Sequence, residues 1–183
     1  MRLCIAFHTV DLYSQNSSVL NLAFLIFFCM IHTLYSLKGL VRVLYSRPVY
    51  YYEMDQMGIV HHANYIHYFE EARLEGMRQL GLGYEQLIEM ELASPVMQLT
   101  CEYMHPSRYP DTLEINLLLK EYDGVRFRFA YEVRRQSDQQ LLARGETLHC
   151  LISSSGIPVR IRTRFPEIHQ LMLRWLEESQ TEN

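Results

Sequence analysis

The second half of the chain repeats its apolar side chains at every second position, and this period constrains the fold more than any other feature. Residues 113–119 and 125–134 both alternate in this way. A period of two is typical of a strand with one buried and one solvated face. Asp123-Gly124 and residues 137–140 are turn signals at hairpin spacing, so we expect consecutive strands to be antiparallel.

A helical pattern precedes these strands. Its apolar residues recur three or four positions apart, as in an amphipathic helix: Tyr65, Tyr68, Phe69, Ala72, Gly76 and Leu80. We expect Asn64 to be the N-cap of this helix and Gly81 to end it. A second, short helix is predicted over residues 84–90.

The remaining segments complete the order of elements. Residues 40–52 predict a first strand with an irregular point at Pro48, and residues 95–104 and 141–152 predict two more strands. A last helix is expected from Pro166, a residue that suits a first helical position. The sequence therefore predicts an α+β fold, in which an antiparallel sheet of about five strands packs on one long helix.

Charged residues are distributed unevenly along the chain. Residues 1–40 contain three charged residues, although the 183 residues include 17 basic and 21 acidic ones. We therefore expect an apolar extension over residues 1–40 and a single domain over residues 41–183. The net charge of −4 offers no broad basic surface, which argues against a nucleic-acid partner and favours a small substrate.

Two features bear on where the protein resides. The apolar run from Leu22 to Ile31 is shorter than the roughly 20 residues that span a bilayer, and no small-residue cleavage site follows it. Membrane association through residues 20–37 is the alternative, and it would involve only the extension. The four cysteines form no close pair or metal-ligand spacing, so we expect free thiols and a cytoplasmic protein.

The loop between the first strand and the long helix concentrates the residues that can do chemistry. Residues 53–64 contain two carboxylates, a glycine and two histidines beside a helix start. Unpaired N–H groups at a helix start can stabilise an oxyanion. A neighbouring carboxylate could attack an activated acyl group, such as a thioester, or take a proton from water. For Asp55 alone, the competing interpretation is a carboxylate that caps a turn.

The same loop and the helix after it carry a resemblance to a known family. The residues concerned are Asp55-Gln56-Met57-Gly58-Ile59-Val60-His61-His62-Ala63-Asn64-Tyr65 and Phe69-Glu70-Glu71-Ala72-Arg73. This pattern resembles the 4-hydroxybenzoyl-CoA thioesterase family, particularly its YbgC-like acyl-CoA thioester hydrolases. The likeness runs from about Val41 to Pro158 and includes Gly145-Glu146-Thr147-Leu148-His149. It implies the hotdog fold, a homodimer with active sites at the subunit interface, and commonly a homotetramer.

The resemblance also implies individual roles. Asp55 matches the catalytic carboxylate, as nucleophile or general base, and His62 matches the position whose backbone N–H polarises the thioester carbonyl. Further substrate-binding residues are expected in the loop and the helix start: Gly58, Val60, Asn64 and Tyr65. The 4-hydroxybenzoyl-specific members hold the CoA phosphates through basic residues near a turn that here contains Asp123 and Gly124. Two nearby arginines are the expected substitutes, with a solvated strand face as the competing interpretation: Arg126 and Arg128.

The implied reaction is hydrolysis of an acyl-CoA, with an aliphatic acyl group favoured and no metal or other cofactor. His62 and His67 lie roughly 140° apart around a helix, which argues against a shared metal. One alternative is a noncatalytic module that binds acyl-thioesters. Another is hydrolysis of acyl groups on acyl carrier protein, which would require a basic surface at Arg108, Arg126 and Arg128.

Overall fold

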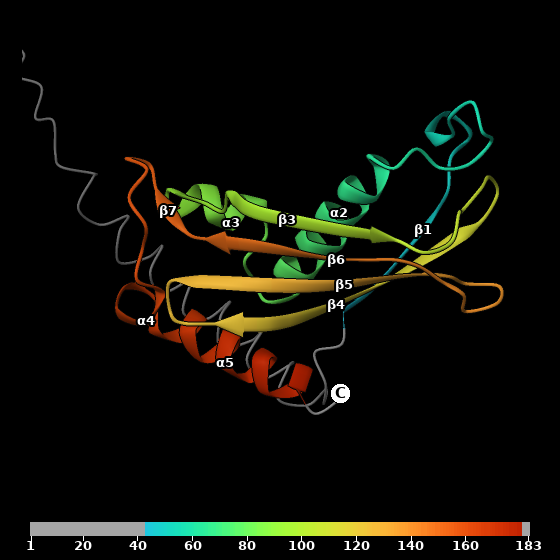
Figure 1. Cartoon of the computed structure of the whole chain (residues 1–183). Coiled ribbons are helices and arrows are strands. Elements are labelled where there is room, and N and C mark those ends of the chain that lie inside the picture. The colour runs from blue at the N-terminus through green and yellow to red at the C-terminus, as the bar shows by residue number, and fades with distance from the viewer. Residues whose placement is uncertain (1–42, 181–183) are drawn as a thin grey trace, which may run out of the picture. The chain divides into compact units, whose positions relative to one another are not determined.

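The computed structural model describes residues 43–180 and contains a five-stranded antiparallel sheet (Figure 1). Its order is β1-β4-β5-β6-β3, so β1 and β3 form the two edges. The strands are β1 (Val43–Pro48), β3 (Val96–Tyr103), β4 (Thr112–Tyr122), β5 (Arg126–Arg135) and β6 (Leu141–Cys150). The predicted α+β class and the antiparallel hairpins are confirmed.

The long helix α2 (Asn64–Gln79) packs against one face of this sheet (Figure 1). Gly76 allows the close approach. A Cβ atom on Gly76 would lie 2.5 Å from Cδ2 of Leu117 on β4 and 3.2 Å from the ring of Trp175. The packed face of β4 is fully buried at Leu113, Ile115, Leu117 and Leu119, as the alternation predicted.

The two ends of α2 test the predicted caps. Gly81 adopts a φ of +73°, its N–H donates to the Arg78 carbonyl, and the Leu82 N–H donates to the Met77 carbonyl. These two bonds form a Schellman motif, so the predicted stop is confirmed. The N-cap prediction was wrong, because Ala63 is the cap residue and Asn64 is already helical. The Asn64 side chain instead donates from Nδ2 to the Glu53 carbonyl at 2.8 Å.

The first strand is shorter than predicted. β1 ends at Pro48, and residues 51–53 form a 3₁₀ turn, η1 (Tyr51–Glu53). Proline has no N–H for a ladder, and the next N–H, of Val49, donates to the Asp111 carbonyl outside the strand. The chain therefore leaves the sheet at Pro48 and begins the loop that the sequence placed at Glu53.

Shorter elements close the end of the sheet away from this loop. They are α3 (Tyr84–Glu89), the paired strands β2 (Leu92–Ala93) and β7 (Ile152–Ser153), and α4 (Ile161–Arg164). The last helix, α5 (Pro166–Gln180), begins at the predicted proline and packs against β4. Ser179 Oγ accepts a hydrogen bond from the Leu119 N–H at 3.1 Å, so α5 covers β4 beyond the end of β1. Among residues 43–180, no helix is both long and apolar enough to cross a membrane. The predicted extension over residues 1–40 and the anchor alternative lie outside the described residues.

A chain of buried polar groups crosses the core beneath β5 and β6. His149 is fully buried, and its Nδ1 donates to the Pro95 carbonyl at 3.1 Å because a carbonyl can only accept. Nε2 therefore accepts from the Thr147 hydroxyl at 2.7 Å, which in turn accepts from Tyr131 at 2.7 Å. Burial, with the nearby charge of Arg73, lowers the pKa of His149 to about 4. The imidazole is thus neutral at neutral pH.

This histidine makes stability sensitive to acid. Its pKa is lower in the folded chain than the ordinary 6.5, so the unfolded chain binds the extra proton. The contribution of His149 to the free energy of unfolding is fully present above about pH 6.5. It is lost as the pH drops toward 4, by about 3 kcal/mol in total. Urea unfolding of the wild type and His149→Gln at several pH values tests this. The glutamine variant should lose that part of the pH dependence, and parallel curves for the two proteins would contradict it.

Candidate active site

The loop before α2 is a small hairpin that carries Asp55 at its tip. The Asp55 N–H donates to the Ile59 carbonyl at 2.8 Å, and the Gly58 N–H donates back to the Asp55 carbonyl at 3.0 Å. Met54 and Val60 form an isolated bridge at its base. Gly58 has a φ of +70°, and a Cβ there would touch nothing within 4 Å. Glycine is therefore needed for the turn itself, and no neighbouring atom excludes a side chain.

The Asp55 carboxylate is held by one of its two oxygens. Oδ1 accepts the Met57 N–H at 2.8 Å, and no other group of the described residues donates to the carboxylate. The side chain is half-buried. The bond from the Met57 N–H is the turn cap of the competing interpretation, and it leaves the second oxygen free to act on a substrate.

The start of α2 leaves the backbone N–H of His62 without an acceptor among the described residues. Its neighbours are occupied: the His61 N–H donates to the Glu53 carbonyl at 2.9 Å, and the Asn64 N–H donates to the His61 carbonyl at 2.9 Å. The Ala63 N–H donates to Nδ1 of His61 at 3.3 Å. Within residues 43–180 nothing accepts from the His62 N–H. This donor at the positive end of α2 is suited to an oxyanion.

A cavity of about 320 Å³ joins the carboxylate to the helix start. Its lining brings together four of the predicted residues, Asp55, Val60, His62 and Tyr65, with Met57, Ile59, Tyr103, Met104, His105 and Pro106. Gly58 and Asn64 are not part of the lining, because one forms the hairpin turn and the other binds the Glu53 carbonyl. Most of the cavity wall is apolar, with Asp55 and two histidines as its titratable exceptions apart from tyrosines.

The residues missed by the sequence come from the end of β3 and the segment after it. Tyr103 donates from its hydroxyl to the His62 carbonyl at 3.0 Å, and its ring contacts the rings of His62 and Tyr65 edge to face. Ser107 is fully buried and accepts the Val60 N–H at its carbonyl, 2.9 Å away. Its hydroxyl shares a hydrogen bond of 2.9 Å with the Tyr65 hydroxyl, whose pKa is raised by burial. Ser107 therefore fastens the hairpin and α2 to the same point.

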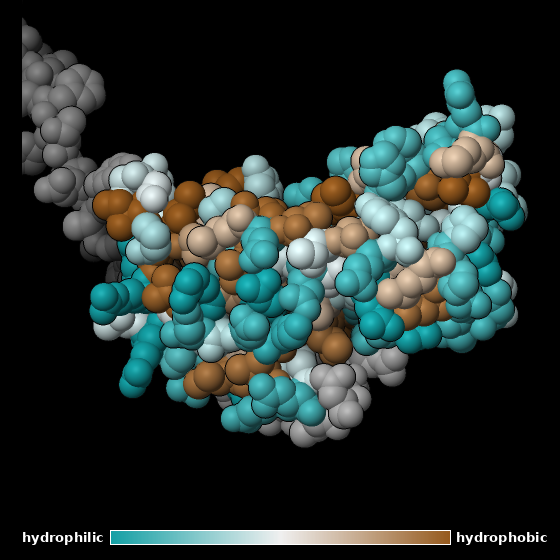
Figure 2. All heavy atoms as spheres, viewed as in Figure 1, coloured by the Kyte–Doolittle hydropathy of each residue, from teal (hydrophilic) through white to brown (hydrophobic). Residues whose placement is uncertain are grey.

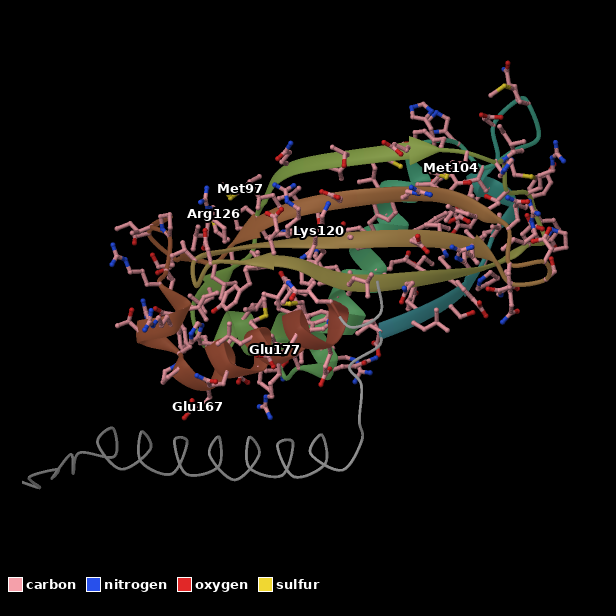
Figure 3. All side chains as sticks on the ribbon, turned by 60° about the horizontal axis from the view of Figure 1, so that its bottom comes forward. Met97, Met104, Lys120, Arg126, Glu167 and Glu177 are labelled. Carbon is pink, nitrogen blue, oxygen red and sulfur yellow. The ribbon has the colours of Figure 1, made fainter. Side chains whose placement is uncertain are left out.

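Within a single chain, Arg126 and Arg128 lie far in space from this cavity. Figure 3 shows Arg126 near Met97, at the opposite end of the sheet from Met104. Arg126 pairs with Asp123 at 3.0 Å, and Arg128 pairs with Glu121 at 3.1 Å. Both arginines line a separate cavity of about 240 Å³. A contact between these arginines and a ligand bound at Asp55 of the same chain would have to extend along the sheet.

Metal binding has no support in the geometry of the described part of the chain. Across residues 43–180, no three His, Cys, Asp or Glu side chains come close enough together to hold an ion. Cys101 and Cys150 are free thiols, and burial raises the pKa of Cys101. Neither thiol lines the Asp55 cavity.

Comparison with known proteins identifies the family of the chain. Residues 49–176 match the family described as the thioesterase-like superfamily. The chain belongs to this superfamily. A putative esterase of Aquifex aeolicus is 39% identical to this thioesterase-like chain over 114 residues, covering 62% of the chain and 88% of the relative. The acyl-CoA thioester hydrolase YbgC of Escherichia coli is 32% identical over 100 residues, or 55% of the chain and 74% of YbgC.

A solved structure supports the same assignment. The DHNA-CoA thioesterase of Staphylococcus aureus matches with a TM-score of 0.70 and 26% identity, covering 77% of this chain and 94% of that one. The predicted hotdog fold and the resemblance to YbgC-like thioester hydrolases are therefore confirmed for this thioesterase-like protein.

Proposed function

We propose that the chain hydrolyses acyl-CoA thioesters to a carboxylic acid and free CoA, with Asp55 and the His62 N–H as the reacting pair. One observation carries the proposal. A single cavity contains a carboxylate with a free oxygen and a backbone N–H without an acceptor at a helix start. These are the two groups that thioester hydrolysis requires.

The chemistry follows from the positions of these groups. The thioester carbonyl oxygen accepts from the His62 N–H, which stabilises the negative charge as the carbonyl carbon becomes tetrahedral. Asp55 either attacks that carbon or removes a proton from the water that attacks it. In both routes the C–S bond breaks and the thiolate of CoA leaves. If Asp55 attacks, water then hydrolyses the acyl-aspartyl anhydride and restores the carboxylate.

The walls of the cavity favour an aliphatic acyl group. Met57, Ile59, Val60 and Met104 supply apolar surface without a charged partner for a polar acyl chain. Methionine side chains adapt to different shapes, so we expect a range of chain lengths to be accepted.

We further propose that two copies of the chain pair through β3. This edge strand has β6 on one side and, within the described residues, no strand on the other. Its exposed side chains include Val96, Met97 and Tyr103, which are about half accessible at 50%, 53% and 49%. Figure 2 shows apolar side chains along the edge of the molecule where β3 lies in Figure 1. An unpaired apolar edge is a site for strand addition, and a second copy offers the same edge.

This pairing would complete the site. If the two β3 strands run antiparallel, the Met97 end of the partner lies beside Tyr103 and Met104, which line the Asp55 cavity. The end of the sheet that carries Arg126 and Arg128 is the same end as Met97. Arginines of the partner, rather than of the same chain, would then be the groups that approach the CoA phosphates.

A charge on the β3 edge should weaken the dimer. Met97→Glu introduces a carboxylate that pairing would have to desolvate, so we expect the dimer Kd to rise about tenfold or more. Analytical ultracentrifugation measures it, with thiol release followed over the same concentrations. Ile157→Glu is the matched control, since Ile157 is also exposed, at 63%, but lies outside β3. Equal association of the two variants would contradict pairing through β3.

A thiol-release assay tests the function itself. The full chain is offered acyl-CoAs of increasing aliphatic chain length, aromatic acyl-CoAs, and the matching acyl carrier protein thioesters. We expect turnover of aliphatic acyl-CoAs. Binding of acyl-CoA without release of thiol would instead favour a noncatalytic module, and turnover of carrier-protein thioesters alone would overturn the CoA assignment.

A further inference from the structure

Glu53, two residues before Asp55, is a buried carboxylate with a complete set of partners. Only 6% of the residue is exposed. Its Oε1 accepts from Nη2 of Arg47 at 2.6 Å, and its Oε2 accepts from the Tyr50 N–H at 2.8 Å. Because both oxygens are used inside the protein, the side chain has one position available to it.

The backbone of the same residue holds the other end of the loop. The Glu53 carbonyl accepts the His61 N–H at 2.9 Å and Nδ2 of Asn64 at 2.8 Å. Glu53 thus ties the start of the hairpin to its end and to the first turn of α2. Asp55 lies two residues beyond Glu53, and His62 lies one residue beyond His61. Each proposed reacting group is therefore at most two positions along the chain from Glu53 or from a residue that Glu53 binds.

Arg47 connects Glu53 to the rigid part of the fold. It lies on β1, is 6% exposed, and reaches α2 through a 3.2 Å ion pair from Nη1 to Glu71. Its guanidinium carbon lies 4.2 Å from the centre of the Tyr68 ring, which is also on α2. The planar guanidinium is fixed by these partners and presents one edge to Glu53. The sheet, the helix and the loop consequently meet at this arginine.

We infer that Arg47 and Glu53 form a positioning pair that sets the Asp55 carboxylate against the His62 N–H. The inference rests on the proposed function, because it assigns the pair an effect on those two groups. A buried ion pair adds little net stability compared with apolar side chains of similar size, so its value here is geometric. Displacing a reacting group by about 1 Å can cost about 100-fold in rate. Glutamine at position 53 has one acceptor oxygen in place of two, so it cannot hold both Arg47 and the Tyr50 N–H, and the loop would loosen.

Glu53→Gln in the full chain tests the pair. We expect kcat for acyl-CoA hydrolysis to fall about 100-fold, with KM within about threefold, since the variant leaves the cavity lining intact. Hydrogen exchange at the His61 and Asn64 amides should accelerate. Glu71→Gln is the matched control, because Glu71 is the other carboxylate that pairs with Arg47 and it lies on α2, outside the loop. The kcat of this variant should stay within about threefold of wild type.

Variants at Arg47 supply a rescue readout. Arg47→Met should lower kcat as Glu53→Gln does, whereas Arg47→Lys keeps a cation near Glu53 and should recover most of the loss. If Glu53→Gln does not fold, Glu53→Asp takes its place, because a side chain one methylene shorter cannot hold both Arg47 and the Tyr50 N–H. The same fall in kcat is expected.

Wild-type kcat in the folded position-53 and Arg47→Met variants would overturn the inference. An equal loss in Glu71→Gln would also overturn it, since general disturbance of the network would then explain the effect. Asp55→Asn separates this failure from failure of the proposed function. If Asp55→Asn is inactive and Glu53→Gln is fully active, only the inference of a positioning pair fails. If Asp55→Asn is active, the proposed function fails.

Discussion

Replacing Asp55 by asparagine should lower kcat for acyl-CoA hydrolysis about 1,000-fold, within the 10²- to 10⁴-fold range of general base catalysis. Asparagine keeps an oxygen that can accept the Met57 N–H, so the hairpin should keep its shape. It lacks the negative charge needed to attack a carbonyl or to take a proton from water. Thiol release under saturating acyl-CoA measures the loss, and thermal unfolding checks that the fold is retained.

Asp138→Asn is the matched control for this experiment. Asp138 is an exposed turn carboxylate that accepts the N–H two residues later, from Gln140, as Asp55 does from Met57. It lies in the β5–β6 turn outside the cavity. Its variant should keep wild-type kcat. Near-normal hydrolysis by Asp55→Asn would remove Asp55 from the reaction, whatever the control shows.

The part of the site that could be predicted from the sequence is the part that is local in the chain. Asp55, Val60, His62 and Tyr65 lie within eleven consecutive positions, and a hairpin followed by a helix start brings them together by short-range geometry alone. The resemblance to a known family depended on these same positions. Local sequence order therefore determined both the motif and its spatial arrangement.

The missed residues depend on long-range register. Tyr103 is the last residue of β3, and Ser107 follows the strand. Both reach the hairpin only because β3 pairs with β6 and the Ser107 carbonyl accepts the Val60 N–H, 47 positions away in the chain. Nothing in the residues 103–107 carries a periodic or catalytic pattern. The role of Glu53 cannot be predicted from the sequence for the same reason, because its partner Arg47 lies beside it only when β1 and the loop are folded together.

Strand direction explains the position of the two arginines. Alternation correctly placed Arg126 and Arg128 on one face of a strand, but it does not say which end of the sheet they occupy. β5 begins at Arg126 and ends at Arg135, whose Nη2 donates to the carbonyl of Pro106 beside the cavity. Nine residues of strand span about 30 Å, so Arg126 is that far from the cavity end.

Replacing Gly145 by alanine should destabilise the chain by about 3 kcal/mol, the upper part of the range for overpacked cores. A Cβ atom there would lie 2.5 Å from the Thr100 carbonyl oxygen of β3 and 2.6 Å from Cζ of the Phe69 ring. The carbonyl belongs to the neighbouring strand, and the ring is stacked on Tyr131 with centroids 4.5 Å apart. Neither neighbour can withdraw without moving the sheet or α2.

Denaturant unfolding measures this loss, and two further variants separate its causes. Gly83→Ala places its Cβ near the flexible end of Gln86, so it should cost less than about 1 kcal/mol. Phe69→Leu combined with Gly145→Ala should be less destabilised than the sum of the two single variants, because the shortened side chain removes one of the two clashes. Strict additivity would instead locate the whole cost at Thr100. The glycine of the Gly145-Glu146-Thr147 segment is therefore explained by the close approach of neighbouring elements to β6, of both α2 and β3 in the expected case and of β3 alone under strict additivity.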